Sequence, residues 1–94
     1  MKKYECLFII DPEAASERFD NVKTAIRQDV ERVHGVLEKT EELGQRALSY
    51  AIKHCVEGFY YLVQFSTEPA TLAEIRTRYR LNPDIVRFLL LSAE

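Results

Sequence analysis

The sequence predicts an α+β fold in which a four-stranded antiparallel sheet carries two helices on one face, in the order β-α-β-β-α-β, the split βαβ arrangement. Four runs of bulky apolar residues are typical of strands, and two segments with apolar residues three or four positions apart are typical of helices. A chain of 94 residues is one domain's length, so a single domain over residues 1–94 is expected. Right-handed crossovers then leave one face of the sheet open.

The first strand is predicted at residues 4–10, a compact apolar run that ends at Asp11 and Pro12. Proline removes an amide donor there, and aspartate suits a turn. The first helix is predicted at about 16–34, because its apolar positions change to a helical period. Gly35 stands where a glycine C-cap is expected to end that helix.

The middle of the chain predicts a long hairpin. Residues 36–50 are expected to form an edge-like strand whose charged side chains deter pairing with another copy, and Gly44 marks a bend or bulge. Residues 51–57 are then the hairpin tip, closed at Gly58. The third strand, at 59–65, has the strongest strand signal in the chain.

The last part of the chain predicts a short helix and a fourth strand. Thr71 and Glu74 have the spacing of a capping box at the start of the helix. Asn82 and Pro83 are expected to end the helix. The apolar run at residues 85–91 predicts the fourth strand.

Strand alternation predicts which side chains face the helices. Burying a polar or charged side chain costs free energy, so Glu5, Gln64 and Arg87 are expected on the open face. Alternation along each strand then places every second apolar residue toward the helices. The inward set is Tyr4, Cys6, Phe8, Ile10, Phe59, Tyr61, Val63, Phe65, Val86, Phe88 and Leu90. The outward set is Leu7, Ile9, Tyr60, Leu62, Leu89 and Leu91. The outward residues would form a contiguous apolar patch, for which a protein partner is favoured over a second copy or the chain's own termini.

Composition and charge narrow the functional classes. Thirteen Lys and Arg oppose fifteen Asp and Glu, and the net charge of −2 excludes a uniformly basic nucleic-acid-coating protein but not a local basic face. Cys6, expected to be buried, and Cys55, expected to be exposed, are too few for a disulfide framework and have no CxxC spacing, which favours a reducing, cytoplasmic setting. No run approaches the roughly 20 apolar residues of a membrane span.

No group of residues typical of an enzyme or a metal site stands out. His34 is expected at a helix end and His54 at the hairpin tip, where surface histidines are usual. Cys55 beside His54 lies on a tip that rarely holds catalytic geometry. The sequence therefore predicts no catalytic residue and no metal ligand.

The basic residues are better organised than the net charge suggests. They begin the first strand, lie toward the hairpin, crowd the end of the second helix and continue on the fourth strand, as Lys2, Lys3, Arg46, Lys53, Arg76, Arg78, Arg80 and Arg87. Two separate basic areas are compatible with this topology. Arg46 and Tyr50 lie four positions apart on an extended arm, where a guanidinium can meet phosphates and a ring can stack on a sugar or base.

The same segments carry a family signature. It consists of Lys3-Tyr4-Glu5, the Asp11-Pro12 stop, the pattern Glu-x-x-Gly-x-Arg-x-Leu-x-Tyr-x-Ile over 41–52, and Gly58-Phe59-Tyr60. Over nearly its whole length the chain resembles the family of the sixth protein of the bacterial small ribosomal subunit. The resemblance implies a ferredoxin-like fold, cytoplasmic location in that subunit, no catalytic activity and no cofactor. It also implies binding to 16S rRNA in the platform region with the eighteenth small-subunit protein as heterodimer partner, and no membrane or small-molecule substrate.

The resemblance also implies the contacts. The residues carried over as rRNA-binding are Lys2, Lys3, Arg46, Tyr50, Lys53, Arg80 and Arg87. Ala51 replaces the usual proline and Ala47 a common basic residue, so a less rigid hairpin and a weaker RNA contact are expected there. The alternative is a ferredoxin-like interaction or regulatory module that does not bind RNA. A small enzyme such as an acylphosphatase ranks third, because no arginine-bearing phosphate loop follows the first strand.

Overall fold

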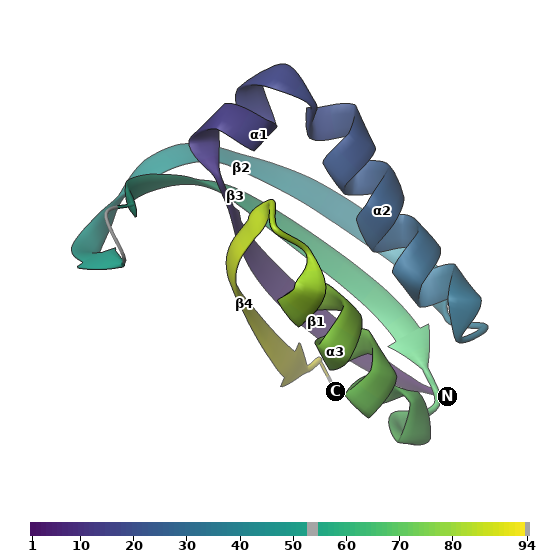
Figure 1. The fold of residues 1–94 in the computed structure, drawn as a ribbon. Coiled ribbons are helices and arrows are strands. Elements are labelled where there is room, and N and C mark those ends of the chain that lie inside the picture. The colour runs from purple at the N-terminus through teal and green to yellow at the C-terminus, as the bar shows by residue number, and fades with distance from the viewer. Residues whose placement is uncertain (53–54, 94) are drawn as a thin grey trace.

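The computed structural model describes residues 1–52 and 55–93, with side chains for 1–46 and 58–93. Its elements are β1 (Lys2–Ile10), α1 (Pro12–Glu17), α2 (Phe19–Arg32), β2 (Val36–Ile52), β3 (Cys55–Thr67), the 3-10 helix η1 (Pro69–Thr71), α3 (Leu72–Leu81) and β4 (Ile85–Ser92). The strands form one antiparallel sheet in the order β2-β3-β1-β4 (Figure 1). This architecture confirms the predicted fold class.

The core lies between the sheet and the helices and contains most of the predicted inward set. Its strand residues are Tyr4, Cys6, Phe8, Ile10, Tyr61, Val63, Phe65 and Leu90, with Phe59 and Phe88 packed against them. They share one cluster with Val22 and Ile26 of α2 and with Tyr79 of α3, so both main helices cover the same face. The ring centroids of Phe8 and Tyr79 lie 4.8 Å apart, edge to face.

Val86 is the exception to the predicted inward set. The β1–β4 register shifts between Ile9 and Ile10, so that Ile10 pairs with Ile85 while Ile9 pairs with Arg87. Ile85 therefore packs against the core, and Val86 is half-buried outside it. A bulge of this kind changes which face a residue occupies, and strict alternation could not predict it.

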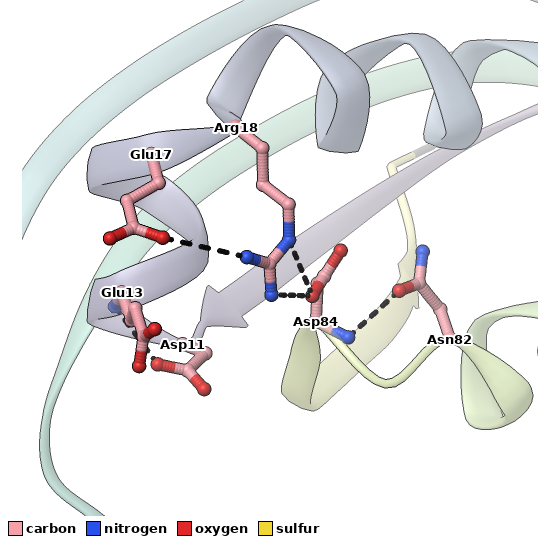
Figure 2. A network of polar contacts seen from close by, with 6 residues as sticks. All are labelled: Asp11, Glu13, Glu17, Arg18, Asn82 and Asp84. Carbon is pink, nitrogen blue, oxygen red and sulfur yellow. Dashed lines mark hydrogen bonds and ion pairs between the residues drawn. The ribbon is translucent and has the colours of Figure 1, made fainter.

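The region predicted as one helix over 16–34 is two helices that begin earlier. Pro12 starts α1, and the Asp11 side chain caps it by accepting from the Glu13 amide at 2.9 Å. Arg18 then breaks the helical path with φ −147° and ψ 38°. Its Nη2 donates to Oδ1 of Asp84 at 2.8 Å, which ties the break to the residue before β4 (Figure 2). The predicted boundaries were wrong because Asp11 and Pro12 act as a helix start as well as a strand stop.

The end of α2 also differs from the prediction in its details. The left-handed residue is His34, with φ 64°, rather than Gly35. The Gly35 amide donates to the Val30 carbonyl at 3.0 Å. A Cβ on Gly35 would lie 2.9 Å from Cγ1 of Val30 and 3.0 Å from the Ser66 carbonyl oxygen. Glycine is therefore needed here for close packing of the helix end on β3.

The hairpin is longer than predicted. Strands β2 and β3 pair from Val36 with Ser66 as far as Ile52 with Cys55, so the predicted tip at 51–57 is mostly strand. The strands continue along this arm through backbone pairing, which leaves little trace in the side-chain pattern. The arm projects from the body of the molecule (Figure 1). Gly44 has φ 90° at a register shift, which confirms the predicted bulge.

The predicted capping box at Thr71 is wrong. The short helix η1 precedes α3, so Thr71 has helical φ −86° and ψ −9° instead of the extended conformation of an N-cap residue. Its Oγ1 donates to the Glu68 carbonyl at 2.8 Å, and Glu74 pairs with Arg78 at 3.5 Å. The two side chains therefore have other partners.

Candidate functional site

The face of the sheet turned away from the helices carries an apolar band. The register places Leu62, Leu7 and Leu89 side by side across β3, β1 and β4. The next row along the strands contains Tyr60, Ile9 and Arg87. The predicted outward residues all lie on this open face, as Leu7, Ile9, Tyr60, Leu62, Leu89 and Leu91. Because neighbouring strands bring them together, the band is continuous.

The band is exposed most at its β4 side. Leu89 and Leu91 are 51% and 52% exposed, whereas the other members are half-buried by their neighbours. A hollow of about 180 Å³ opens between them, lined by Leu7, Ile9, Tyr60, Arg87, Phe88 and Leu89. This shape can receive an apolar side chain from another molecule.

Polar groups border the band at both ends. At one end Nε2 of Gln64 donates to Oε2 of Glu5 at 3.2 Å. At the other end the guanidinium carbon of Arg46 lies 5.9 Å from the ring centroid of Tyr60, within the range of a cation–π contact. An apolar centre with a polar rim is the usual composition of a protein interface.

Arg46 is the one predicted RNA contact of the hairpin arm whose side chain the structure describes. It is exposed on β2 and pairs in register with Gly58 at the base of the hairpin arm. The Tyr50 backbone continues the same strand, whereas its side chain, like all of Lys53, lies outside the described residues. Arg46 thus connects the arm to the open face.

Lys2 and Lys3 lie at the opposite end of the sheet. They pair with Thr67 and Ser66, whereas Arg46 pairs with Gly58, so about eight residues of β3 separate the two places. At the usual rise of a strand this is roughly 25 Å. Nζ of Lys3 also lies 3.8 Å from Oε1 of Glu38. Lys2 and Lys3 therefore form a basic area separate from Arg46.

Arg80 and Arg87 come together with a third arginine that was not predicted as a contact. Arg76, Arg80 and Arg87 line a cleft of about 330 Å³ between α3 and β4. Arg76 and Arg80 are one helical turn apart, and this spacing is the sequence signal that could have found Arg76. Arg87 lines both this cleft and the hollow on the open face.

The groups with the most perturbed proton affinities lie in the core, away from both surfaces. Burial raises the pKa of the Cys6 thiol to about 12 and raises the pKa of Tyr79 above its ordinary value. Within residues 1–52 and 55–93, no three His, Cys, Asp or Glu side chains gather as metal ligands would. None of the described helices has the length and apolar character to cross a membrane.

Sequence comparisons match the chain to known proteins over nearly all of its length. The family described as ribosomal protein S6 matches residues 3–92. The small ribosomal subunit protein bS6 of Helicobacter pylori (strain P12) is 34% identical over 94 residues, which are 100% of this chain and 66% of that protein. The bS6 of Desulforamulus reducens is 35% identical over 91 residues, covering 97% of this chain and 96% of its own length. The chain thus spans just under two thirds of the Helicobacter relative.

Solved structures give the same assignment. The crystal structure of 30S ribosomal protein S6 from Thermotoga maritima has a TM-score of 0.89 and 33% identity, covering 97% of this chain and 86% of that chain. The C-terminal domain of MgtC from Mycobacterium tuberculosis, with a TM-score of 0.66 and 16% identity, shares the fold alone. The matches in sequence and structure, which extend over nearly all of this chain, show that it belongs to the ribosomal protein S6 family.

Proposed function

We propose that this protein is a non-enzymatic structural component of the small ribosomal subunit that binds 16S rRNA together with the eighteenth small-subunit protein. The observation that carries the proposal is that the apolar band on the open face adjoins the basic hairpin arm. The apolar band ends at Tyr60, and Arg46 lies over the Tyr60 ring. A protein on the band would therefore lie beside RNA held by the hairpin arm.

The family match supports this role. The relatives from Helicobacter and Desulforamulus are both named small ribosomal subunit proteins, and the Thermotoga structure is that of a 30S ribosomal protein. The chain matches them through its whole sheet and both main helices. Function in the cytoplasmic ribosome is part of the proposal.

The open face is the proposed binding surface for the protein partner. Leu89 and Leu91 expose about half of their surface, and covering such area is the main favourable term in most protein associations. The hollow beside Leu89 and Ile9 gives the partner a place for one apolar anchor. A basic partner would also explain how a chain with a net charge of −2 takes part in RNA binding.

The proposed RNA contacts fall into three groups. Arg46, Tyr50 and Lys53 belong to the hairpin arm, where a guanidinium fork can meet two phosphate oxygens and an aromatic ring can stack on a base. Arg80 and Arg87 belong to the cleft between α3 and β4. Lys2 and Lys3, at the far end of the sheet, would contact a different segment of the RNA.

The alternative is an interaction or regulatory module that does not bind RNA. The apolar band alone would suit such a module, because it explains a protein partner without any nucleic acid. The two proposals differ in what Arg46 does. In the alternative, the Arg46 side chain serves only as a polar rim over Tyr60.

Sedimentation with ribosomal particles tests the proposal. Labelled chain is added to small subunits depleted of their own copy, and the particles are separated on a sucrose gradient. The chain is expected to sediment with the small subunit, and Leu62→Asp to remain at the top, because the new carboxylate lies in the band. Gln28→Asp, an exposed position on α2 outside all the proposed surfaces, is the matched control and should sediment like wild type. Wild-type chain that stays at the top would contradict the proposal.

A further inference from the structure

We infer that the first turns of α2 fix the direction of the hairpin arm, and that Lys23 is thereby a positioning residue for Arg46. The inference rests on the proposed rRNA binding and deepens it, because Lys23 was not among the predicted contacts. Its basis is a bulge in β2 at the base of the arm. Side chains of α2 hold the hairpin on both sides of that bulge.

The bulge lies where the hairpin leaves the body of the molecule. The β2–β3 register shifts between Glu42 and Gly44, and Gly44 has φ 90°. A bulge of this kind bends its strand and increases the local twist, and the two strands curve together along the arm (Figure 1). Apart from the neighbours of Gly44 in the chain, no described residue comes within 4 Å of where its Cβ would lie. Packing at Gly44 therefore does not hold the bend.

On β2, the residue before the bulge is attached to α2. Nζ of Lys23 donates to Oε2 of Glu42 at 3.4 Å. The same Nζ lies 3.5 Å from Oδ1 of Asp20 and 4.8 Å from the ring centroid of Phe19. Because these neighbours all belong to the first turns of α2 and Lys23 is half-buried, its ammonium group meets the strand at a defined place.

On β3, the residue opposite the far side of the bulge is also attached to α2. Phe59 pairs with Gln45, which follows Gly44. The ring centroids of Phe59 and Phe19 lie 4.7 Å apart, and Phe19 also meets Tyr61 edge to face at 5.5 Å. Aromatic pairs at these separations attract one another beyond the effect of the area that they bury. The helix therefore holds β3 as well as β2.

The two attachments together determine where Arg46 lies. Phe19 and Lys23 are one helical turn apart, so they lie on the same side of α2. Arg46 pairs with Gly58, the neighbour of Phe59 in the chain. A binding group that is already held in its bound geometry loses less conformational entropy when its ligand arrives. Lys23 is thus expected to raise the affinity for RNA without touching it.

Distances between spin labels test the direction of the arm without RNA. Gln28→Cys on α2 and Ala47→Cys on the arm are labelled in a chain that carries Cys55→Ser, because Cys6 is fully buried. Double electron–electron resonance should give one narrow distance distribution. Adding Lys23→Met, which keeps the apolar stem and removes the charge, should broaden or shift it, and Lys23→Arg should restore it. A broad distribution before Lys23 is changed, or one that Lys23→Met leaves unaltered, would overturn the inference.

Glu42→Ala separates positioning from simple electrostatics in RNA binding. The chain and its protein partner are titrated against a platform fragment of 16S rRNA at several salt concentrations. Removing a carboxylate near the arm would by itself strengthen binding to a polyanion. Loss of the attachment to Lys23 should instead weaken binding about two- to fivefold, as expected of an exposed ion pair. Glu31→Ala, which removes the same charge near the other end of α2, should bind like wild type.

The salt dependence of Lys23→Met shows whether Lys23 itself contacts the RNA. A positioning residue should lower the affinity about two- to fivefold and leave the log–log salt slope at its wild-type value, because the number of phosphate contacts is unchanged. Lys23→Arg should recover the affinity. A fall of about 0.7 to 0.9 in the slope would make Lys23 a direct phosphate contact and overturn its positioning role.

The outcomes distinguish this inference from the proposed function. If wild type binds the fragment and Glu42→Ala binds as tightly as Glu31→Ala, the attachment to α2 does not position Arg46, and the proposed function stands. If wild type does not bind the fragment at any salt concentration, the proposed function is wrong and the role assigned to Lys23 in RNA binding is wrong with it. The label distances still decide whether α2 fixes the arm. Circular dichroism of each variant confirms that its fold is intact.

Discussion

The Cγ2 methyl of Ile9 occupies the space that a side chain on Gly58 would need. A Cβ placed on Gly58 would collide with this methyl group. The two residues belong to β1 and β3 at the base of the hairpin arm, where Ile9 also lines the hollow of the open face. Glycine at position 58 therefore lets the apolar band continue up to the arm.

Gly58→Ala is expected to destabilise the fold by about 1 to 3 kcal/mol, the usual cost of overpacking. The cause is steric and not a strained backbone. Among the described glycines Gly44 has a positive φ, and Gly58 does not. Urea unfolding measures the change. Ile9→Leu moves the branch away from the β carbon, so the double variant Ile9→Leu/Gly58→Ala should recover part of the loss. A double variant no more stable than Gly58→Ala would show that Ile9 is not the obstacle.

Leu62→Asp is expected to weaken association with the protein partner by tenfold or more while the chain stays folded. The side chain faces away from the helices and pairs with Leu7 at the centre of the band. A carboxylate there would lose its water when a partner covers it. Isothermal titration with the eighteenth small-subunit protein measures the change, and Ala73→Asp on α3 controls for added charge. Equal affinity for both variants would place the interface elsewhere.

Cys6 is expected to be protected from thiol reagents in the folded protein. Its side chain is fully buried in the core cluster, and burial raises its pKa to about 12, so little thiolate exists at pH 8. The Cys55→Ser variant leaves Cys6 as the single thiol. It should react slowly in buffer and rapidly in denaturant. Rapid reaction in buffer would contradict the register of β1.

Tyr79→Phe is expected to leave stability at pH 7 unchanged or to raise it by up to about 1 kcal/mol. The hydroxyl is buried and has no hydrogen-bond partner among the residues that the structure describes. Removing an unsatisfied polar group relieves its desolvation cost. A loss of more than about 1 kcal/mol in urea unfolding would show that the hydroxyl has a partner.

The pH dependence of the same variant provides a second check. Burial raises the pKa of Tyr79 above its ordinary 10.0, so the phenol stays neutral in the folded protein while it ionises in the unfolded chain. This contribution to stability is complete below pH 10 and is lost as the pH rises further. Tyr79→Phe should therefore lose less stability than wild type between pH 9 and 11. Cys6 and Tyr61 also have raised pKa values, and both residues are present in wild type and variant, so the difference in stability is assigned to Tyr79.

Much of the fold was predictable because the spacing of apolar residues along the sequence matches the pattern of buried residues in the structure. The alternation of Tyr4, Cys6 and Phe8 with Glu5 and Leu7 determines both faces of β1, and the structure confirms it. The break at Arg18 was not predictable, because it depends on Asp84, which is far away in sequence. The conformation of Thr71 depends on the preceding turn, so its spacing to Glu74 alone was misleading.

The open face was predictable for the same reason as the core. Successive side chains of a strand point to opposite faces, so the inward residues determine the outward ones. The α3–β4 cleft was not, because it exists only where a helix packs beside a strand. Arg76 and Arg80 show a common spacing in the sequence, but nothing there indicates that Arg87 lies beside them. The opposite placement of Lys2 and Arg46 likewise follows from the strand register, which pairs them with Thr67 and Gly58.

The central claim is that this chain binds rRNA through Arg46 on the hairpin arm, and a salt titration tests it most directly. A platform fragment of 16S rRNA is titrated with wild type, Arg46→Lys, Arg46→Glu and the charge-matched control Arg32→Glu, with the protein partner present. Arg46→Glu should bind most weakly, and its log–log slope should fall by about 0.7 to 0.9 or more. Arg46→Lys should lie between it and wild type, because it keeps the charge without the fork. If Arg46→Glu bound as tightly as Arg32→Glu at every salt concentration, the assigned RNA surface would be wrong and a module that does not bind RNA would become the better account.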